Sequence, residues 1–226
     1  MSHSYTVVFG LTADPIHLGH EQAIINGVNY CRKFNLEINQ FLLMPVYQPN
    51  LIAGKKGPIA TFQQRFDMCE IVAKRLSKKL DCKVEASLIE KQSSEALDEK
   101  SYSFNTIKYI TESETESKSA KLLFMVSADH FQGRWPKFRK WFNWQELINY
   151  SGLLINQRPG HKININFISQ LKKINKDIFV IEESKSVAIS SSEIRASNDL
   201  TKLKFLSKDI ERYVLKANLY GKKKGP

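Results

Sequence analysis

The fold of this chain is decided by the stretch Tyr5-Thr6-Val7-Val8-Phe9-Gly10-Leu11-Thr12-Ala13-Asp14-Pro15-Ile16-His17-Leu18-Gly19-His20. An apolar strand that ends in a glycine turn and opens into a helix aims backbone N–H groups at one point, and the helix dipole adds positive potential there. Residues three positions apart share a helix face, so His17 and His20 can point at the same anion. Gly19, between them, is expected to let a ligand approach the backbone closely. The stretch therefore predicts a phosphate site.

The two histidines also allow plainer interpretations. His17 and His20 could be a helix cap and a surface imidazole, but the preceding strand and glycine turn favour a functional role. Zinc binding is disfavoured, because a His-x-x-His pair needs further ligands that the sequence does not visibly supply.

Two motifs at opposite ends of the chain carry a family resemblance. The run from His17 to His20 resembles the (H/T)xGH signature of the nucleotidylyltransferase superfamily, and the stretch from Ile189 to Arg195, Ile-Ser-Ser-Ser-Glu-Ile-Arg, is similar to its second signature, ISSTxIR. Further stretches resemble one branch, the nicotinate (or nicotinamide) mononucleotide adenylyltransferases, in the order expected. These are Ser101–Ile107 (family SYTxxTL), Ser127–Asp129 (GAD), Gln157–Gly160 (RPG) and the closing helix Val214–Tyr220.

The resemblance implies a reaction and a set of site residues. ATP, carrying Mg²⁺, would give its adenylyl group to nicotinate mononucleotide, and the products would be deamido-NAD and pyrophosphate. The residues that would bind ATP are Gly10, Thr12, His17, His20, Asp129, Ser190, Ser191, Ser192 and Arg195, with His17, His20 and Arg195 as the catalytic groups and no metal ligand from the protein. The residues that would bind the mononucleotide are Lys55, Lys56, Ser103, Thr106 and Trp141.

Several of these assignments have alternatives. The run of serines before Glu193 could be only a helix cap, which is compatible with phosphate binding at the same helix end. Asp129 could instead be an N-cap, although the binding role is favoured, and Ser103 and Thr106 could be exposed helix residues. Trp135 competes with Trp141 for the place on the pyridine ring. Either Lys55 or Lys56 would supply the charge of the family's PPHK segment.

The phosphate loop departs from the family pattern Gly-Gly-x-Phe-Asp-Pro. Leu11 stands at the second glycine and is expected to add a side chain where the backbone meets the substrate, while Ala13 lacks the family's ring. These changes leave the acceptor open to nicotinamide mononucleotide or another phosphate-bearing molecule, such as a pantetheine phosphate. A non-catalytic nucleotide-binding regulator is a further alternative, although such a protein has no need of His17, His20 and Arg195 together.

Apolar runs and helical patterns alternate along the chain, which predicts βαβ units and an α/β fold with a doubly wound, mostly parallel sheet, as in a Rossmann-like nucleotidylyltransferase. Polar stretches at 93–100 and 111–119 are expected as loops or helix ends. We expect one domain over 1–226, with a basic tail at 221–226. The expected strands are 5–9, 40–44, 83–88, 122–126, 153–156 and 178–181, and the expected helices are 19–34, 62–80, 104–113 and 144–150.

Composition limits the classes of protein. The 226 residues carry a net charge of +11, but no nucleic-acid recognition motif accompanies it, so a solvated basic face or steering of a phosphate-rich substrate explains it better. No apolar run approaches the ~20 residues of a membrane span and no signal peptide is visible, so a cytoplasmic protein is expected. The three cysteines lack metal spacing and are expected to be reduced thiols. The oligomeric state stays open.

Overall fold

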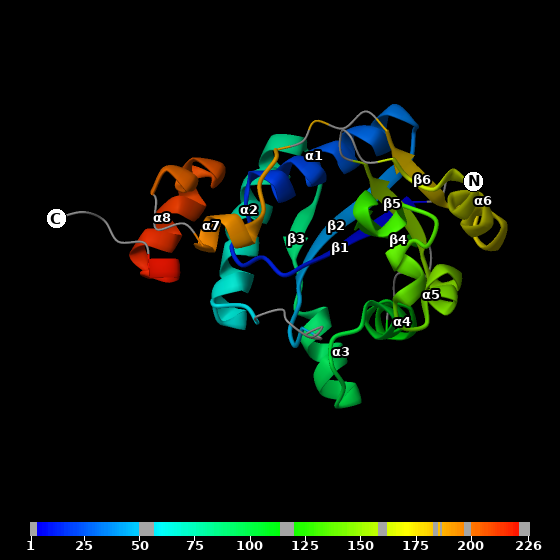
Figure 1. Cartoon of the computed structure of the whole chain (residues 1–226), viewed down its shortest axis with the longest axis horizontal. Coiled ribbons are helices and arrows are strands. Elements are labelled where there is room, and N and C mark those ends of the chain that lie inside the picture. Colours follow the sequence, from blue (N-terminus) through cyan, green and yellow to red (C-terminus); the bar gives the residue numbers. More distant parts are fainter. Residues whose placement is uncertain are drawn as a thin grey trace.

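The computed structural model of the chain, drawn in Figure 1, describes residues 4–49, 57–113, 120–157, 162–182, 185, 187–196 and 200–221. Its centre is a six-stranded sheet with the order β3-β2-β1-β4-β5-β6. Every pair of neighbouring strands is parallel. The strands are β1 (Ser4–Leu11), β2 (Glu37–Pro45), β3 (Val84–Ala86), β4 (Lys121–Ser127), β5 (Gly152–Asn156) and β6 (Ile178–Ile181).

Helices connect the strands and follow the last one. The α-helices are α1 (Leu18–Lys33), α2 (Phe62–Leu80), α3 (Ile89–Leu97), α4 (Ser103–Ser113), α5 (Trp144–Tyr150), α6 (Ile165–Ile174), α7 (Ser191–Ala196) and α8 (Lys208–Lys216). The 3₁₀ turns are η1 (Ala128–Phe131), η2 (Lys137–Lys140), η3 (Leu200–Phe205) and η4 (Leu219–Gly221). No helix among the described residues is long and apolar enough to span a membrane.

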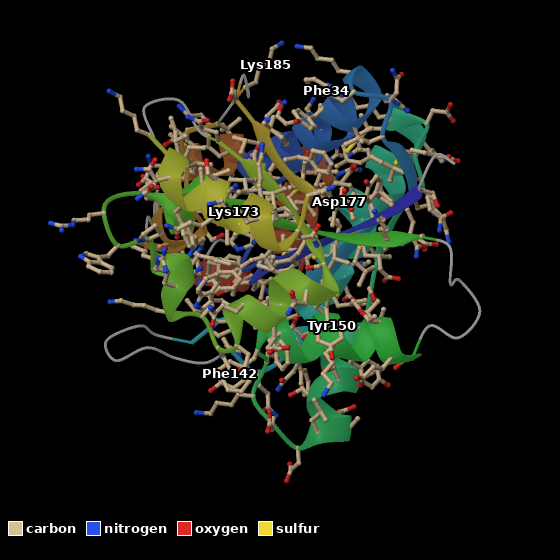
Figure 2. All side chains as sticks on the ribbon, turned by 90° about the vertical axis from the view of Figure 1, so that its right-hand side faces the viewer. Phe34, Phe142, Tyr150, Lys173, Asp177 and Lys185 are labelled. Atoms are coloured by element: carbon tan, nitrogen blue, oxygen red, sulfur yellow. The ribbon has the colours of Figure 1, made fainter. Side chains whose placement is uncertain are left out.

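The sheet is buried on both faces. Successive residues of a strand point to opposite sides of the sheet, so two buried neighbours show that both sides are covered. Val7 and Val8 in the central strand are both fully buried, and they belong to two different core clusters. One cluster joins the sheet to α1, α2 and α8, and the other joins it to α4, α5 and α6. Figure 1 shows these two groups of helices on the two sides of the sheet, and Figure 2 shows the side chains that fill the layers between them.

The order of the strands places the functional edge. The chain leaves β1 for β2 and β3 on one side and then returns to β4 on the other side. In open parallel sheets, ligands bind outside the carboxyl ends of the strands where the order reverses. That point here lies between the end of β1 at Leu11 and the end of β4 at Ser127, which are the two strands followed by predicted site residues.

The predicted fold class is confirmed, and each of the six expected strands is present. The segment from Ser93, expected as a loop or helix end, forms the second half of α3. The amphipathic helix α6 is missing from the expected elements. In the expected closing helix, the regular helix α8 ends at Lys216, and Tyr220 has a left-handed backbone with φ 57°.

Candidate active site

The two histidines close the amino end of α1 with a reciprocal pair of hydrogen bonds. The backbone N of Gly19 donates to His17 Nδ1 at 3.1 Å, and the backbone N of His17 donates to His20 Nδ1 at 3.3 Å. The two rings lie with their centroids 3.8 Å apart and their planes tilted by 31°. Because each Nδ1 accepts a backbone proton, each neutral ring carries its own proton on Nε2 and is a hydrogen-bond donor there. The helix cap and the anion site are therefore compatible uses of the same side chains.

Gly19 has a role that differs from the expected close approach of a ligand. A Cβ at this position would lie 2.9 Å from Cε1 and 3.0 Å from Nδ1 of His17. Carbon atoms do not approach so closely without something moving, so glycine is required here to make room for the imidazole of His17. The side chain of His17 is thereby fixed against the helix end, and His17 is only 3% exposed.

The loop after β1 is fixed by buried residues. The expectation for Leu11 is wrong, because its side chain is 6% exposed and packs in the core cluster with α1 and α2, away from the loop's surface. Ala13 is fully buried and has φ 55°, a strained backbone for a residue other than glycine. The guanidinium of the buried Arg65 donates to the backbone O of Thr12 at 3.0 Å and to that of Val46 at 2.6 Å. Burial lowers the pKa of Arg65.

The second predicted motif lies directly against this loop. Ser190 is the cap of α7, since its backbone N and hydroxyl both donate to Glu193 and its hydroxyl accepts from the backbone N of Glu193. These hydrogen bonds from Ser190 hold the pKa of Glu193 below its usual value. The hydroxyl of Ser191 donates to the backbone O of Pro15 at 3.0 Å, across 176 residues of sequence. Ser192, next along, is exposed.

Arg195 reaches the loop from α7. Its Nη1 donates to the backbone O of Asp14 and lies 3.4 Å from Oδ2 of the same residue. The side chain of Arg195 is 21% exposed, whereas that of Asp14 is fully buried. The structure thus brings His17, His20 and Arg195, which the sequence predicts as the catalytic groups, to the same short loop between β1 and α1. Gly10 is the residue before the end of β1, and a Cβ there would make only ordinary contact with Phe124, at 3.6 Å.

Asp129 and Trp141 lie together beyond the end of β4. Asp129 is in the turn η1 and its Oδ2 lies 3.8 Å from Nε2 of His130. The ring of His130 meets that of Trp141 edge to face at 5.0 Å. Trp141 packs partly on the core through Phe138, whereas Trp135 is 75% exposed. Of the two tryptophans, Trp141 is therefore the one that is linked to Asp129, through the ring of His130.

The rest of the predicted mononucleotide site is described in part. Thr106 on α4 is 1% exposed, and its hydroxyl donates to the backbone O of Tyr102 at 3.2 Å and to Glu90 at 3.4 Å. Burial raises the pKa of Glu90 to about 7, against hydrogen bonds from Ser101 and Thr106. Ser103 begins the same helix. Lys55 and Lys56 lie outside the described residues, as does most of the RPG segment, so their roles stay predictions.

Sequence reasoning missed Asp14, Arg65, Glu90 and Tyr220 as residues that hold the site. One of them carried a signal, since Arg65 falls one turn before Met68 and Cys69 on the buried face of α2. A charge on the apolar stripe of a helix needs a buried partner, which here is the backbone of the loop. The other three show no local pattern of this kind.

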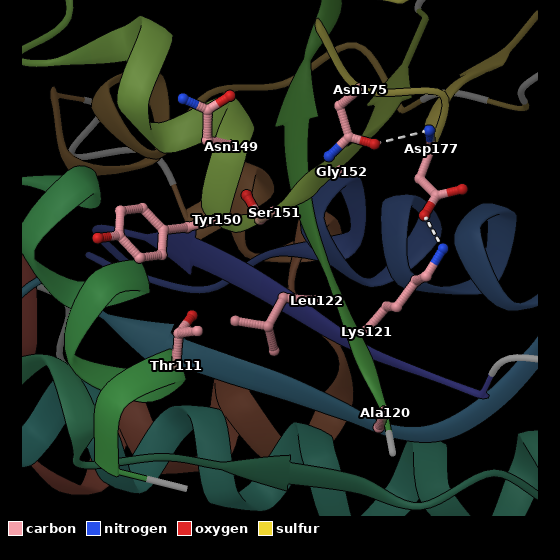
Figure 3. Close-up of a pocket in the computed structure, with 10 residues that line it drawn as sticks. All are labelled: Thr111, Ala120, Lys121, Leu122, Asn149, Tyr150, Ser151, Gly152, Asn175 and Asp177. Atoms are coloured by element: carbon pink, nitrogen blue, oxygen red, sulfur yellow. Dashed lines mark hydrogen bonds and ion pairs between the residues drawn. The ribbon is translucent and has the colours of Figure 1, made fainter. Parts of the chain in front are cut away.

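Two hollows lie away from these residues. The hollow in Figure 3, of about 450 Å³, is lined by Lys121, Leu122 and Gly152 at the amino ends of β4 and β5, and also by Asp177 just before β6. It therefore opens at the edge opposite to the phosphate loop, and the 2.9 Å ion pair between Lys121 and Asp177 forms part of its lining. A second hollow, of about 660 Å³, runs along the outer side of α1 beside β6. The helix-end geometry, and not either hollow, defines the candidate site.

Comparison with known proteins agrees with the two motifs. Residues 8–197 match the family described as Cytidylyltransferase-like, so the match covers both the loop after β1 and the helix α7. The chain belongs to this family. Its resemblance to the nicotinate mononucleotide adenylyltransferases is confirmed by relatives named probable nicotinate-nucleotide adenylyltransferase. The one from Shewanella frigidimarina is 26% identical over 233 residues, which cover 94% of this chain and 98% of the relative.

The relatives differ in how much of their length is matched. A relative with the same name from Shewanella baltica is 29% identical over 157 residues, and this match spans 70% of this chain but 62% of the relative. Among solved structures, the nicotinic acid mononucleotide adenylyltransferase of Plasmodium falciparum complexed with NaAD is 21% identical, with a TM-score of 0.70 over 97% of this chain and 98% of that one. At 21% identity this likeness shows the fold alone. The present chain therefore has a Rossmann-like nucleotidylyltransferase fold.

Proposed function

We propose that this protein transfers the adenylyl group of ATP to nicotinate mononucleotide and releases pyrophosphate. The observation that carries the proposal is the meeting of the two motifs, in which Ser191 and Arg195 of α7 bond to Pro15 and Asp14 of the phosphate loop. Donors from two distant segments are thereby fixed around one place at the carboxyl end of the central strand. The relatives of this chain, named for the same reaction, support the choice of acceptor.

The chemistry follows from the groups at this place. A phosphate oxygen of the mononucleotide would attack the α-phosphorus of ATP in line, and the bond from that phosphorus to the bridging oxygen of pyrophosphate would break. No covalent intermediate with the protein is needed, because the acceptor phosphate is itself the nucleophile. The protein must hold two polyanions in line and stabilise the charge that builds on the α-phosphate and the leaving group.

Seven of the predicted residues then have a stated task. His17 and His20 would donate hydrogen bonds from their Nε2–H groups to the α- and β-phosphates, at the positive end of α1. Arg195 and the exposed Ser192, on α7, would bind the β- and γ-phosphates. Asp129 and Trp141, beyond the end of the neighbouring strand β4, would bind a ribose and stack on the pyridine ring. Thr106 is buried, and its part in the site would be to hold α4 against Glu90.

The donor set also indicates how Mg²⁺ takes part. Imidazole, guanidinium and hydroxyl donors suit phosphate oxygens, whereas Mg²⁺ prefers carboxylates, phosphates and water. The one carboxylate within the loop, Asp14, is already surrounded by N–H and O–H donors. Mg²⁺ would therefore arrive on the triphosphate, where it neutralises charge, and the protein need not supply a cage for it.

The test is pyrophosphate release by the purified protein with ATP and Mg²⁺, in parallel reactions with nicotinate mononucleotide, with nicotinamide mononucleotide and without an acceptor. Release that depends on the nicotinate form supports the proposal. A clear preference for the nicotinamide form would keep the mechanism and replace the acceptor. ATP binding without release in any of the reactions would overturn adenylyl transfer to a pyridine mononucleotide.

A further inference from the structure

The carboxylate of Asp14 is the meeting point of four segments of the chain. The backbone N of Ile59 donates to its Oδ2 at 2.8 Å and that of Ala60 to its Oδ1 at 3.0 Å. The hydroxyl of Tyr220 donates to Oδ1 at 2.9 Å, and Nη1 of Arg195 lies 3.4 Å from Oδ2. Asp14 is fully buried. A buried charge is tolerated only when it is paired and hydrogen-bonded, so the position of each partner depends on the others.

Arg195 is the charged partner of the Asp14 carboxylate, and its side chain is 21% exposed. Its guanidinium is held at Nη1 by both the backbone O and the carboxylate of Asp14. A free arginine side chain is flexible, and fixing it before the ligand arrives lowers the entropy lost on binding. A change in the position of the Asp14 carboxylate is therefore transmitted directly to the guanidinium.

Tyr220 lies beyond residues 8–197, which match the Cytidylyltransferase-like family, and it ends the stretch Val214–Tyr220 that resembles the adenylyltransferase branch. Its ring is 7% exposed and packs in the core cluster shared with α2 and α8. Its backbone has φ 57°, a conformation that a bulky residue adopts only where the surroundings fix it. Burial, and next the charge of Asp14, raise the pKa of Tyr220 well above its usual value, so the hydroxyl stays protonated and donates.

From this network we infer that Tyr220 is a positioning residue for nucleotide binding, which acts through the Asp14 carboxylate to hold the Arg195 guanidinium ready for the phosphates of ATP. The inference rests on the proposed function in that it takes ATP as the ligand of Arg195. It gives the segment after α7 a task in the site, although no atom of Tyr220 itself need touch the nucleotide.

The chain offers a matched control for this residue. The hydroxyl of Tyr213, on α8, donates at 2.7 Å to the carboxylate of Asp67 on α2, and its ring is also partly buried. The variants Y220F and Y213F therefore each remove one hydroxyl that donates to an aspartate. Of these two aspartates, Asp14 contacts Arg195 and Asp67 does not.

The experiment measures the dissociation constant of Mg-ATP by calorimetry, together with the thermal midpoint, for the wild type, Y220F and Y213F. We expect Y220F to weaken ATP binding about tenfold, the scale of a lost hydrogen bond to a charged group, and Y213F to leave it unchanged. Both variants should lower the thermal midpoint. A Y220F protein that binds ATP as the wild type does, or that does not fold, would overturn the inference, because the hydroxyl would then serve only the fold.

A double-mutant cycle separates action through Arg195 from a general effect. In the R195A background, Y220F should change ATP affinity by less than about twofold, since coupled residues are not additive. An undiminished loss in that background would also overturn the inference. The cycle does not depend on turnover. A wild type that binds ATP but releases no pyrophosphate defeats only the proposed function, and a wild type that does not bind ATP defeats both.

Discussion

Replacing Gly19 by alanine tests whether the His17 imidazole must stay where the helix end now holds it. The new Cβ would lie 2.9 Å from Cε1 of His17, 3.0 Å from its Nδ1 and 3.3 Å from the backbone O of Val187. The backbone oxygen cannot withdraw easily, so the imidazole must turn. Its turn breaks the hydrogen bond from the backbone N of Gly19 and moves Nε2 away from the phosphate position.

The magnitude follows from three opposing terms. Alanine gains about 1 kcal/mol over glycine from helix propensity. Loss of the helix cap costs about 1 kcal/mol, and a methyl group forced into packed space costs about 1–3 kcal/mol. The free energy of unfolding should therefore fall by about 1–3 kcal/mol, which lowers Tm by roughly 3–9 °C in a chain of this size. Turnover should fall about 10²-fold, the scale of one lost preorganised donor.

The control is Gly27→Ala in the same helix. There a Cβ would meet only side-chain atoms, Phe41 Cε2 at 3.3 Å and Leu154 Cδ2 at 3.4 Å, and no part of the candidate site. Urea unfolding and pyrophosphate release should be measured for both variants. Near-normal turnover in Gly19→Ala would refute the reasoning, since the imidazole of His17 would then act equally well from another position.

Three further changes test other parts of the site. His20→Ala should lower turnover about 10²-fold by removing a donor to the transition state, and turnover near that of the wild type would contradict this role. Burial raises the pKa of Glu90 from 4.5 to about 7, so the folded protein favours the protonated carboxyl. The stability that depends on this proton is fully present below pH 4.5 and is lost as the pH rises through 7. Urea unfolding at pH 5 and pH 8 should show a fall of up to about 3 kcal/mol that E90Q lacks; an equal fall in E90Q would exclude Glu90 as its source. Trp141→Ala should raise KM for the mononucleotide more than KM for ATP, whereas Trp135→Ala should change neither. The reverse pattern would move the stacking role to Trp135.

The fold could be predicted well because its signals are local. The strands β1, β4 and β5 contain short apolar runs, since both faces of the sheet are covered there and both sets of side chains must be apolar. The helix α2 is bounded by Thr61, which accepts from the backbone N of Gln64, and by Asp81 with φ 45°. The missed helix α6 had a usable signal in Asn164, which caps it by accepting from the backbone N of Phe167. The missed helix α3 had none, since it begins without a side-chain cap at Leu88.

The site could be predicted only where its residues lie in motifs. The two histidines belong to a stretch whose spacing points to phosphate binding, and Arg195 belongs to a stretch that resembles the second signature of the family. The place of Leu11 could not be foreseen, because whether a residue at a strand end faces the core or the ligand depends on the register with β2, in which Leu11 pairs with Pro45. Asp14 and Tyr220 are 206 residues apart, and no local pattern links them. Tertiary contacts of this kind determine how the motif residues are held.

The hydrogen bond between Asp14 and Tyr220 also orders events during protein synthesis. At about 5–20 residues per second, the ribosome makes the hydroxyl roughly 10–40 s after the carboxylate that it serves, since 206 positions separate the two. A nascent chain arrested just after Ala196 would already carry both phosphate motifs and every strand of the sheet. Its loop would still lack one donor at the buried carboxylate. By the inference drawn above for Tyr220, ATP binding at full affinity would therefore require a chain that has been translated as far as η4.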